Sequence, residues 1–447
     1  MHLVYENAIK NLISFWSGKF KDLDHKNQAY TVDKAIWEGI GKATAQAKKT
    51  IPRAYGPAIP NMNEEGVRIT ADMYSFWFQF LGPVLLQNVF KNKVVYDHFI
   101  LLVTLISKCL QLSITETTVE EIRQGFIDWV EDYERIYFQY TGERLAACVS
   151  TIHTLLHIAD GIEMLGPVWV YWAFAMERFC GKLARLIRNR RFPFSQLDNQ
   201  VLQEAQLTQI KNDFNLHREL TFNPKDGPRM SEYYLKPKPT ITPALRTTLA
   251  KALVTRFSAL DATKDDLIPL ERAKELLLAS EIEGWGRLRR LGGGDTMLAN
   301  AFVSQQADDR RDATFIRFDP LVDAKATALT QKPRLEQDRY YGQLTHLFLI
   351  RVPVTPDLSI EEPTEIALAV IDECHKPSRH KASGFNIFTY TKRMAPQAVD
   401  IITIQGLVGR LYWDKKWAIL DRNGDVACDN FAALDDGAQP TEEDDLE

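Results

Sequence analysis

The sequence is poor in cysteine and contains no long hydrophobic run. Its cysteines are scattered through 447 residues without a CxxC pair, which excludes a disulfide framework and a zinc ribbon. The longest apolar run, residues 99–107, is too short to cross a bilayer. The opening residues carry no signal-peptide pattern. We therefore expect a nuclear or cytoplasmic protein that is neither secreted nor inserted in a membrane.

The sequence also lacks a strong net charge of either sign. Its formal net charge of -5 gives no global reason to bind nucleic acid. The distribution is more informative, because residues 435–447 hold seven carboxylates and no base, whereas residues 178–191 concentrate six bases. The acidic stretch predicts a disordered tail over 431–447.

An amphipathic helix is predicted over 168–190. At 100° per residue its apolar stripe consists of Trp169, Trp172, Ala173, Met176, Cys180, Leu183 and Ile187. Arg178, Lys182 and Arg185 fall on the opposite side, and Glu177 lies at the border. Gly181 and Arg188 follow Glu177 along the helix, where a phosphate chain could approach closely. Core packing of the stripe and a solvated basic face explain the same spacing, so the pattern alone leaves both interpretations open.

Hydrophobic spacing predicts a mainly helical first half and a β-rich last third. A period of 3.6 residues indicates helices at 3–17, 68–80, 94–112, 117–140, 147–164 and 194–212, with two more at 242–257 and 267–278. The helix at 117–140 offers a capping box at Thr117 or Thr118 with Glu120 or Glu121. Its predicted buried stripe consists of Ile122, Phe126, Val130, Tyr133, Tyr137 and Tyr140. A period of two predicts strands at 344–352, 366–371, 385–390, 399–408 and 417–420, with a hairpin turn at 423–424. We expect these strands to form a small β-barrel or sandwich.

Four stretches of the chain resemble the C-terminal region of fungal CACTA-type (En/Spm-like) DNA transposases. The family pattern of Gly-Pro, an aromatic stretch, Met-Glu-Arg, Gly and a basic Arg-Asn segment matches GPVWVYWAFAMERFCGKL and the following RNRRFPFSQLDNQVLQEAQLTQ. The three other stretches are MHLVYENAIKNLISFWSGKF at the start, TADMYSFWFQFLGPVLL after it, and the late YYGQLTHLFLIRVP with VGRLYWDKKWAILDR. One departure is Ala175, where the fungal pattern usually has proline, so the aim of Glu177 is expected to differ.

The resemblance implies an RNase H-like nuclease whose acidic residues hold two Mg²⁺ or Mn²⁺ ions. It assigns the late catalytic and metal-binding glutamate to Glu177, and a supporting role to His157. It also places an acidic residue immediately before the pair that is here Met1-His2, so the upstream catalytic acids are expected to be missing from this chain. We therefore expect the metals only in the intact family enzyme.

The resemblance and the periodicity together suggest five segments. These are a helical insertion-type domain at 1–145, the end of the RNase H-like region at 146–215, a linker with accessory helices at 216–334, a small β domain at 335–430 and the acidic tail at 431–447. The fold class is thus multi-domain, with a mainly α N-terminal half and a small C-terminal β domain.

The leading hypothesis is a truncated or domesticated transposase fragment that binds DNA and does not cleave it alone. The DNA-binding candidates are Arg178, Lys182, Arg185, Arg188, Arg190 and Arg191. The alternative is a non-enzymatic interaction protein that modulates an intact transposase in trans, or associates with itself.

Three smaller patterns leave alternatives open. His153, His157 and Asp160 share one helix face, and Cys148 precedes them, which fits either a metal site or a hydrogen-bonded group. The run at 292–295 lacks the Lys-Ser/Thr of a phosphate-binding loop, so we expect no nucleotide there. The tryptophans Trp77, Trp129, Trp169 and Trp172 could stack on bases, although core burial is the simpler interpretation.

Overall fold

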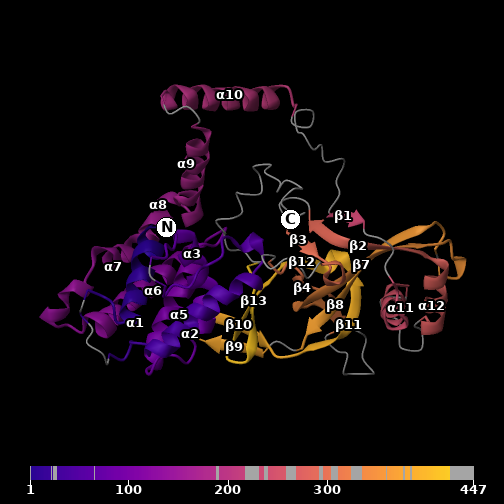
Figure 1. Cartoon of the computed structure of the whole chain (residues 1–447), viewed down its shortest axis with the longest axis horizontal. Helices are drawn as coiled ribbons and strands as arrows, with labels where there is room; N and C mark the ends of the chain where they lie inside the picture. Colours follow the sequence, from indigo (N-terminus) through magenta and orange to yellow (C-terminus); the bar gives the residue numbers. More distant parts are fainter. Residues whose placement is uncertain are drawn as a thin grey trace.

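The computed structural model has helices in the N-terminal half of the chain and antiparallel sheets in the C-terminal half (Figure 1). It describes residues 2–21, 23, 28–64, 66–187, 191–216, 231–235, 240–257, 268–290, 295–303, 311–323, 335–358, 360–375, 378–382 and 385–422. The predicted acidic tail and the predicted turn at 423–424 lie outside these residues.

The helical half is built from ten α-helices with short 3-10 and π segments between them, within the residues described. The α-helices are α1 (Ile9–Trp16), α2 (Lys34–Gln46), α3 (Ala71–Phe76), α4 (Gly82–Leu85), α5 (Lys93–Cys109), α6 (Glu116–Tyr133), α7 (Ser150–Thr154), α8 (Ile158–Leu165), α9 (Phe174–Leu186) and α10 (Pro193–Asp213). The shorter segments are η1 (His2–Ala8), η2 (Ala47–Lys49), η3 (Arg53–Tyr55), η4 (Trp77–Leu81), η5 (Glu134–Phe138), η6 (Gly142–Ala147), η7 (Leu155–His157) and η8 (Val168–Val170). Each helix predicted in this half overlaps an observed helical segment, although 168–190 is divided into η8 and α9, and α2 and α4 were not predicted.

The core of the helical half is aromatic. Trp16 donates its indole N–H to the hydroxyl of Tyr137 at 3.0 Å, and both side chains are fully buried. Phe15 stacks on Phe20 with ring centroids 3.9 Å apart. His98 on α5 stacks on Trp129 of α6 at 4.5 Å, and the indole N–H of Trp129 donates to the His98 carbonyl at 3.0 Å. These contacts join α1, α5 and α6 into one packed layer.

Helix α6 differs from its prediction at both ends. Its N-cap is Thr115, whose hydroxyl accepts from the Thr118 backbone N–H at 3.3 Å, so the predicted capping box at Thr117 or Thr118 is wrong. Tyr140, predicted to be buried, is 63% exposed. The chain enters the left-handed region at Gln139 and Tyr140, with φ of 56° and 51°, and this turns Tyr140 away from the helix stripe.

The C-terminal half contains an eight-stranded antiparallel sheet, a four-stranded sheet and a two-stranded ribbon in its described residues. The strands are β1 (Ser231–Leu235), β2 (Glu281–Arg290), β3 (Thr296–Leu298), β4 (Phe315–Phe318), β5 (Leu321–Asp323), β6 (Leu335–Gln337), β7 (Tyr340–Val352), β8 (Thr364–Cys374), β9 (Ser378–Ala382), β10 (Phe385–Tyr390), β11 (Arg393–Asp400), β12 (Ile404–Leu407), β13 (Gly409–Trp413) and β14 (Lys416–Leu420). Short 3-10 segments are η10 (Asn300–Phe302), η11 (Pro356–Leu358) and η12 (Ile401–Thr403). The described strands form no closed barrel, so the barrel alternative is wrong.

Strand β7 is the centre of the large sheet because it pairs with β8 along one edge and with β2 and β4 along the other. Its residues 347–350 are buried on both faces. On one face Phe348 and Ile350 pack against α11 (Pro243–Phe257) and α12 (Leu270–Ala279), and on the other Leu347 and Leu349 belong to the core shared with the helical half. A strand covered on both faces loses the alternation of a half-exposed strand.

A hairpin of two residues joins β13 to β14. Trp413 pairs with Lys416, and the intervening Asp414 and Lys415 have φ of 47° and 60°. Positive φ at both central positions is the geometry of a type I′ turn, which matches the twist of the paired strands. β13 is an edge strand of the four-stranded sheet, and it contacts α2 and η2 of the helical half.

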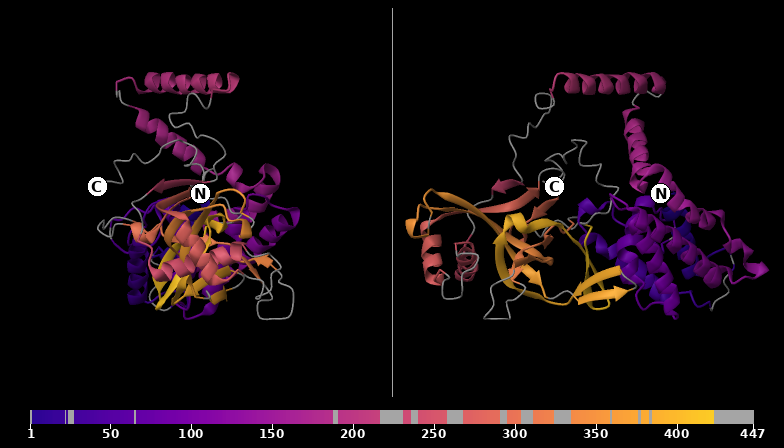
Figure 2. Two further views of the ribbon diagram at one scale, coloured as in Figure 1. Left: turned by 90° about the vertical axis from the view of Figure 1, so that its right-hand side faces the viewer. Right: turned by 180° about the vertical axis from the view of Figure 1, so that it is seen from behind.

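The helical half and the sheets share one hydrophobic core. A continuous cluster runs from the first helices to Leu407, Leu411 and Leu420 in the sheets. The hydroxyl of Tyr55, on η3, lies 2.8 Å from the carbonyl oxygen of Leu420 and 3.0 Å from that of Leu407. Its own oxygen accepts from the backbone N–H of Arg422 at 3.3 Å. We call these contacts of Tyr55 with Leu407, Leu420 and Arg422 the seam between the two halves. The two halves lie side by side in Figures 1 and 2.

Helices α9 and α10 stand away from this body and form an arm (Figures 1 and 2). Phe174 is the only buried residue of α9, and α10 has none among its described residues. The arm is held at its bend by the Gln196 side-chain amide, which donates to the Leu186 carbonyl at 2.9 Å. A helix pair with so little burial is stabilised mainly by local interactions.

Candidate functional site

Glu177 lies in the first turn of α9, against the start of the chain. Its Oε1 lies 3.2 Å from Nε2 of His2, and the other ring nitrogen of His2 pairs with Glu6 one turn further along η1. The side chains of His2 and Glu177 are more than half exposed. The hydrogen bond to Glu6, followed by the charges of Glu6 and Glu177, raises the pKa of His2 above its usual value near 6.5. His2 thus lies between two carboxylates, which favour its protonated form.

This cluster does not fit the metal pair that the resemblance implies. A two-metal site needs several carboxylates that converge on the ions, whereas here an imidazole separates Glu6 from Glu177. In the part of the chain that the structure describes, no group of three or more His, Cys, Asp or Glu side chains is arranged to hold a metal ion.

The helix around Glu177 is shorter than predicted. After η8 the backbone leaves the helical course at Tyr171 and resumes it at Phe174, so 168–190 is not one helix. Ala175 consequently occupies the first turn of α9, where proline would also be tolerated. Alanine or proline at this position would leave the start of α9 without a kink, so the local backbone gives no reason for a different aim of Glu177.

The predicted apolar stripe of this helix is not buried. Met176 is 64% exposed, and Cys180 and Ile187 also face solvent, whereas Trp172 and Leu183 are half-buried. Phe179, outside the predicted stripe, is exposed as well. Of the two interpretations left open by the sequence, core packing of the stripe does not hold, because only the first turn of α9 reaches the body of the protein.

The basic side chains lie on an accessible helix but differ in their surroundings. Arg185 is exposed and Arg178 half-buried, and neither pairs with a carboxylate among the residues described. Lys182 forms an ion pair with Glu204 of α10 at 2.6 Å. Arg191 lies over the ring of Phe192 at 5.4 Å, and Arg188 and Arg190 lie outside the described residues. An open surface surrounds Gly181, whose missing side chain would meet nothing within 4 Å.

His157 interacts with its own helical segment rather than with Glu177, as far as the described residues go. Its Nε2 lies 3.4 Å from Nε2 of His153, and its Nδ1 lies 3.3 Å from Oδ2 of Asp160. Asp160 also pairs with Arg123 of α6, which binds Glu163 at 2.7 Å. The guanidinium of Arg123 holds the pKa of Asp160 below its usual range.

The remaining candidates have structural roles. Trp77 and Trp129 are fully buried, so neither can stack on a base, and Trp169 donates its indole N–H to the Leu112 carbonyl at 3.2 Å. Asp295, the described end of the glycine run, binds the Arg422 guanidinium at 2.5 Å and accepts the Leu407 backbone N–H at 2.9 Å. Asp295 thus belongs to the seam.

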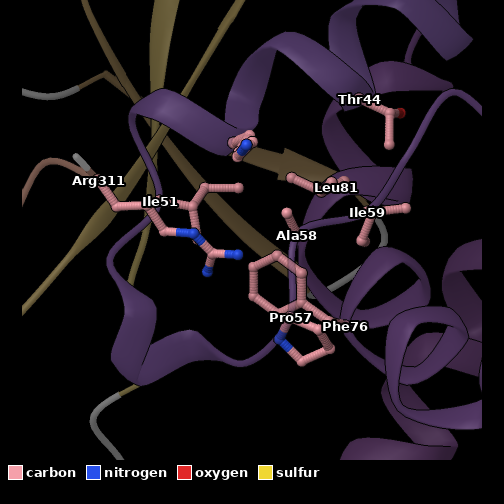
Figure 3. Close-up of a pocket in the computed structure, with 9 residues that line it drawn as sticks. Thr44, Ile51, Pro57, Ala58, Ile59, Phe76, Leu81 and Arg311 are labelled. Carbon is pink, nitrogen blue, oxygen red and sulfur yellow. The ribbon is translucent and has the colours of Figure 1, made fainter. Parts of the chain in front are cut away.

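A small cavity between helices and sheet was not predicted. Thr44, Ile51, Phe76, Leu81 and Arg311 are among its lining residues (Figure 3). Its volume of about 10 Å³ leaves room for roughly one water molecule. Burial beside Arg53 lowers the pKa of Arg311, whose guanidinium donates to the Gly56 carbonyl at 2.5 Å. This cavity is too small for an organic substrate.

In comparisons with known proteins, no family model, no curated protein and no solved structure matches this chain. No helix in the described part of the chain is long and apolar enough to span a bilayer.

Proposed function

We propose that this chain is the C-terminal region of a CACTA-type DNA transposase, which binds DNA and does not cleave it alone. The observation that carries the proposal is the contact between His2 and Glu177 at 3.2 Å. In the transposase pattern an acidic residue precedes the Met-His pair, and the late glutamate belongs to the same catalytic site. Two positions that belong to one catalytic site must lie close together in the fold, and the contact between His2 and Glu177 meets this requirement.

The path of the chain between the two motifs supports the same proposal. The chain leaves η1, builds α1 to α8 and returns, so that α3 and α7 again contact η1. A helical insertion between two catalytic positions needs such a return. The residues from α1 to α6 account for this insertion-type layer, and α7 to α9 bring the chain back to His2.

DNA binding is proposed for the outer surface of the arm. Arg178, Lys182 and Arg185 follow one another on α9 at spacings of three and four residues, which places them along one side of the helix. Phosphate contacts by such residues supply affinity without sequence information. The ion pair between Lys182 and Glu204 is exposed to solvent. Lys182 can therefore leave Glu204 and bind a DNA phosphate at a small cost in free energy.

The exposed apolar side chains of the arm favour a second candidate function, an interaction protein that acts without catalysis. Phe179, Leu202 and Ile210 are each more than 40% exposed, and α10 buries no residue among those described. Large apolar side chains gathered on a helix pair are typical of a surface that another protein covers. The partner would be an intact transposase or a second copy of this chain, and either function is compatible with a nuclear protein.

The test of the proposed function is direct binding of duplex DNA by the purified chain. Fluorescence anisotropy with a labelled random-sequence duplex at low salt should give saturable binding that weakens as salt rises. Multi-angle light scattering on the same sample reports the oligomeric state. No binding at low salt, together with a stable dimer or a complex with an intact transposase, would leave the interaction protein as the better account.

A further inference from the structure

We propose that His153 and His157 form a two-imidazole site for a borderline divalent transition-metal ion, with zinc as the reference ion. His153 lies in the last turn of α7, and His157 ends η7, the short 3-10 segment that leads into α8. Both side chains are exposed at the surface, so an ion can reach them without an opening of the fold.

The distance between the two nitrogen atoms matches metal coordination. Zn–N bonds of about 2.0–2.1 Å at a tetrahedral angle place two ligand nitrogens about 3.3–3.4 Å apart. The two Nε2 atoms are 3.4 Å apart, with the rings nearly perpendicular at 79°. The competing use of the same atoms is a proton shared between the two rings, and the experiment below separates these two uses.

Asp160 prepares His157 for coordination. Its carboxylate can only accept, so the neutral His157 ring carries its proton on Nδ1 and donates it to Oδ2 across 3.3 Å. The lone pair of Nε2 is then directed toward His153. A carboxylate behind a ligating histidine is the usual arrangement at metal sites, where it fixes the tautomer and the ring orientation. Asp160 is therefore a positioning residue and not a ligand.

The neighbouring charges favour a cation. Arg123 brings one positive charge, and its two partners, Asp160 and Glu163, bring two negative charges, so the group sums to one negative charge. Arg123 belongs to α6, and its two ion pairs fix the position of Asp160 relative to the histidines. A bound ion would thus connect α7 to the segment before α8, and α8 is already linked to α6 by the ion pairs of Arg123.

With two protein ligands, water molecules would occupy the remaining coordination positions of the ion. This is consistent with the absence of a three-residue metal group from the described part of the chain. Imidazole suits zinc, nickel and copper, whereas magnesium and manganese prefer oxygen. The site is therefore distinct in chemistry from the two-metal nuclease centre, and it does not depend on the proposed function.

The experiment is isothermal titration of the full chain with zinc chloride in a non-chelating buffer at pH 7.5. We expect one zinc per chain, at least tenfold weaker binding in His153→Ala and in His157→Ala, and a tenfold to hundredfold loss in Asp160→Asn. His375→Ala, which removes an exposed histidine after β8, should bind zinc as the wild type does. Cys148→Ser should also leave binding unchanged.

Thermal unfolding separates loss of the site from loss of the fold. With a chelator present, wild type and variants should unfold at similar temperatures. Zinc should raise the midpoint of the wild type and of the two control variants, His375→Ala and Cys148→Ser, but not that of His153→Ala or His157→Ala. Absence of saturable binding by the wild type would overturn the proposal. Unchanged affinity in either alanine variant, or loss of binding in Cys148→Ser, would overturn it equally.

Discussion

Nε2 of His2 lies 3.2 Å from Oε1 of Glu177, although all the helices from α1 to α8 separate the two residues in the sequence. The contact places the beginning of the chain at the first turn of α9. It also gives Glu177 a local partner, the imidazole of His2.

The titration of His2 reports this contact. Because Glu6 and Glu177 raise the pKa of His2, its ring should titrate above 6.5 in two-dimensional NMR spectra of the imidazole nitrogens. Glu6→Gln should lower this pKa most, and Glu177→Gln should lower it less. The pairing stabilises the fold fully below pH 6.5 and is lost as pH rises through the higher folded-state pKa. Titration near 6.5 in all three proteins would rule out the cluster.

The chain alone should not cut DNA. Glu177 and Glu6 are separated by His2, and two-metal phosphoryl transfer needs carboxylates on both sides of the ions. Supercoiled plasmid incubated with the protein and Mg²⁺ or Mn²⁺ should stay intact. Nicking by the wild type that disappears in Glu177→Gln would reveal a complete site.

The seam between helices and sheets should respond to loss of a single hydroxyl. Tyr55→Phe removes the one hydroxyl that the carbonyls of Leu407 and Leu420 share as a donor, which should lower the free energy of unfolding by about 1–3 kcal/mol. Tyr412→Phe makes the same chemical change at an exposed position and should cost less than about 0.5 kcal/mol. Urea unfolding measures both values, and equal effects would contradict the structural role of the seam.

Mild acid should destabilise the helical half through His98. Burial lowers the pKa of this histidine to about 3, and its Nε2 donates to the Trp129 carbonyl at 3.1 Å. In the unfolded chain His98 protonates near pH 6.5, whereas in the folded chain it stays neutral until about pH 3. Folding stability is therefore unaffected by His98 above pH 6.5 and declines as pH falls from 6.5 toward 3. Between pH 7 and pH 5 the expected loss from His98 is about 2 kcal/mol.

Denaturant unfolding across this range, compared with His98→Gln, isolates the contribution. The variant keeps a donor for the Trp129 carbonyl but cannot titrate, so it should start less stable and fall less steeply with pH. Identical slopes for the two proteins would show that His98 does not control the acid response.

Much of the helical half was predictable because its signals are local. Ile122, Phe126 and Tyr133 recur at helical spacing and are buried as expected. Helix α2 was missed, although Asp33 caps it by accepting the Ala35 N–H at 2.9 Å. The strands β2 to β5 were also missed, because short segments pair with distant ones and carry little periodicity of their own.

The candidate site was predictable in its residue types but not in its contacts. The spacing on α9 identified the basic residues, yet it gave no sign that the apolar stripe would stay exposed, since burial depends on where the arm stands relative to the body. The partner of Glu177 was also unforeseen, because His2 is remote in the sequence and only the return of the chain brings it close. The domain boundaries proposed from periodicity stay predictions.

The most direct test of the account is the salt dependence of DNA binding by the wild type and by the variant with Lys182, Arg185 and Arg188 replaced by glutamine. If about four phosphates are contacted, log affinity should fall with log salt at a slope of about -3.6, and each lost contact should reduce the slope by about 0.9. A control variant with exposed Lys10, Lys34 and Lys42 replaced by glutamine loses the same charge from α1 and α2. The account predicts a shallow slope for the first variant and the wild-type slope for the control. An unchanged slope in the first variant, with its helical circular dichroism intact, would contradict DNA binding through α9.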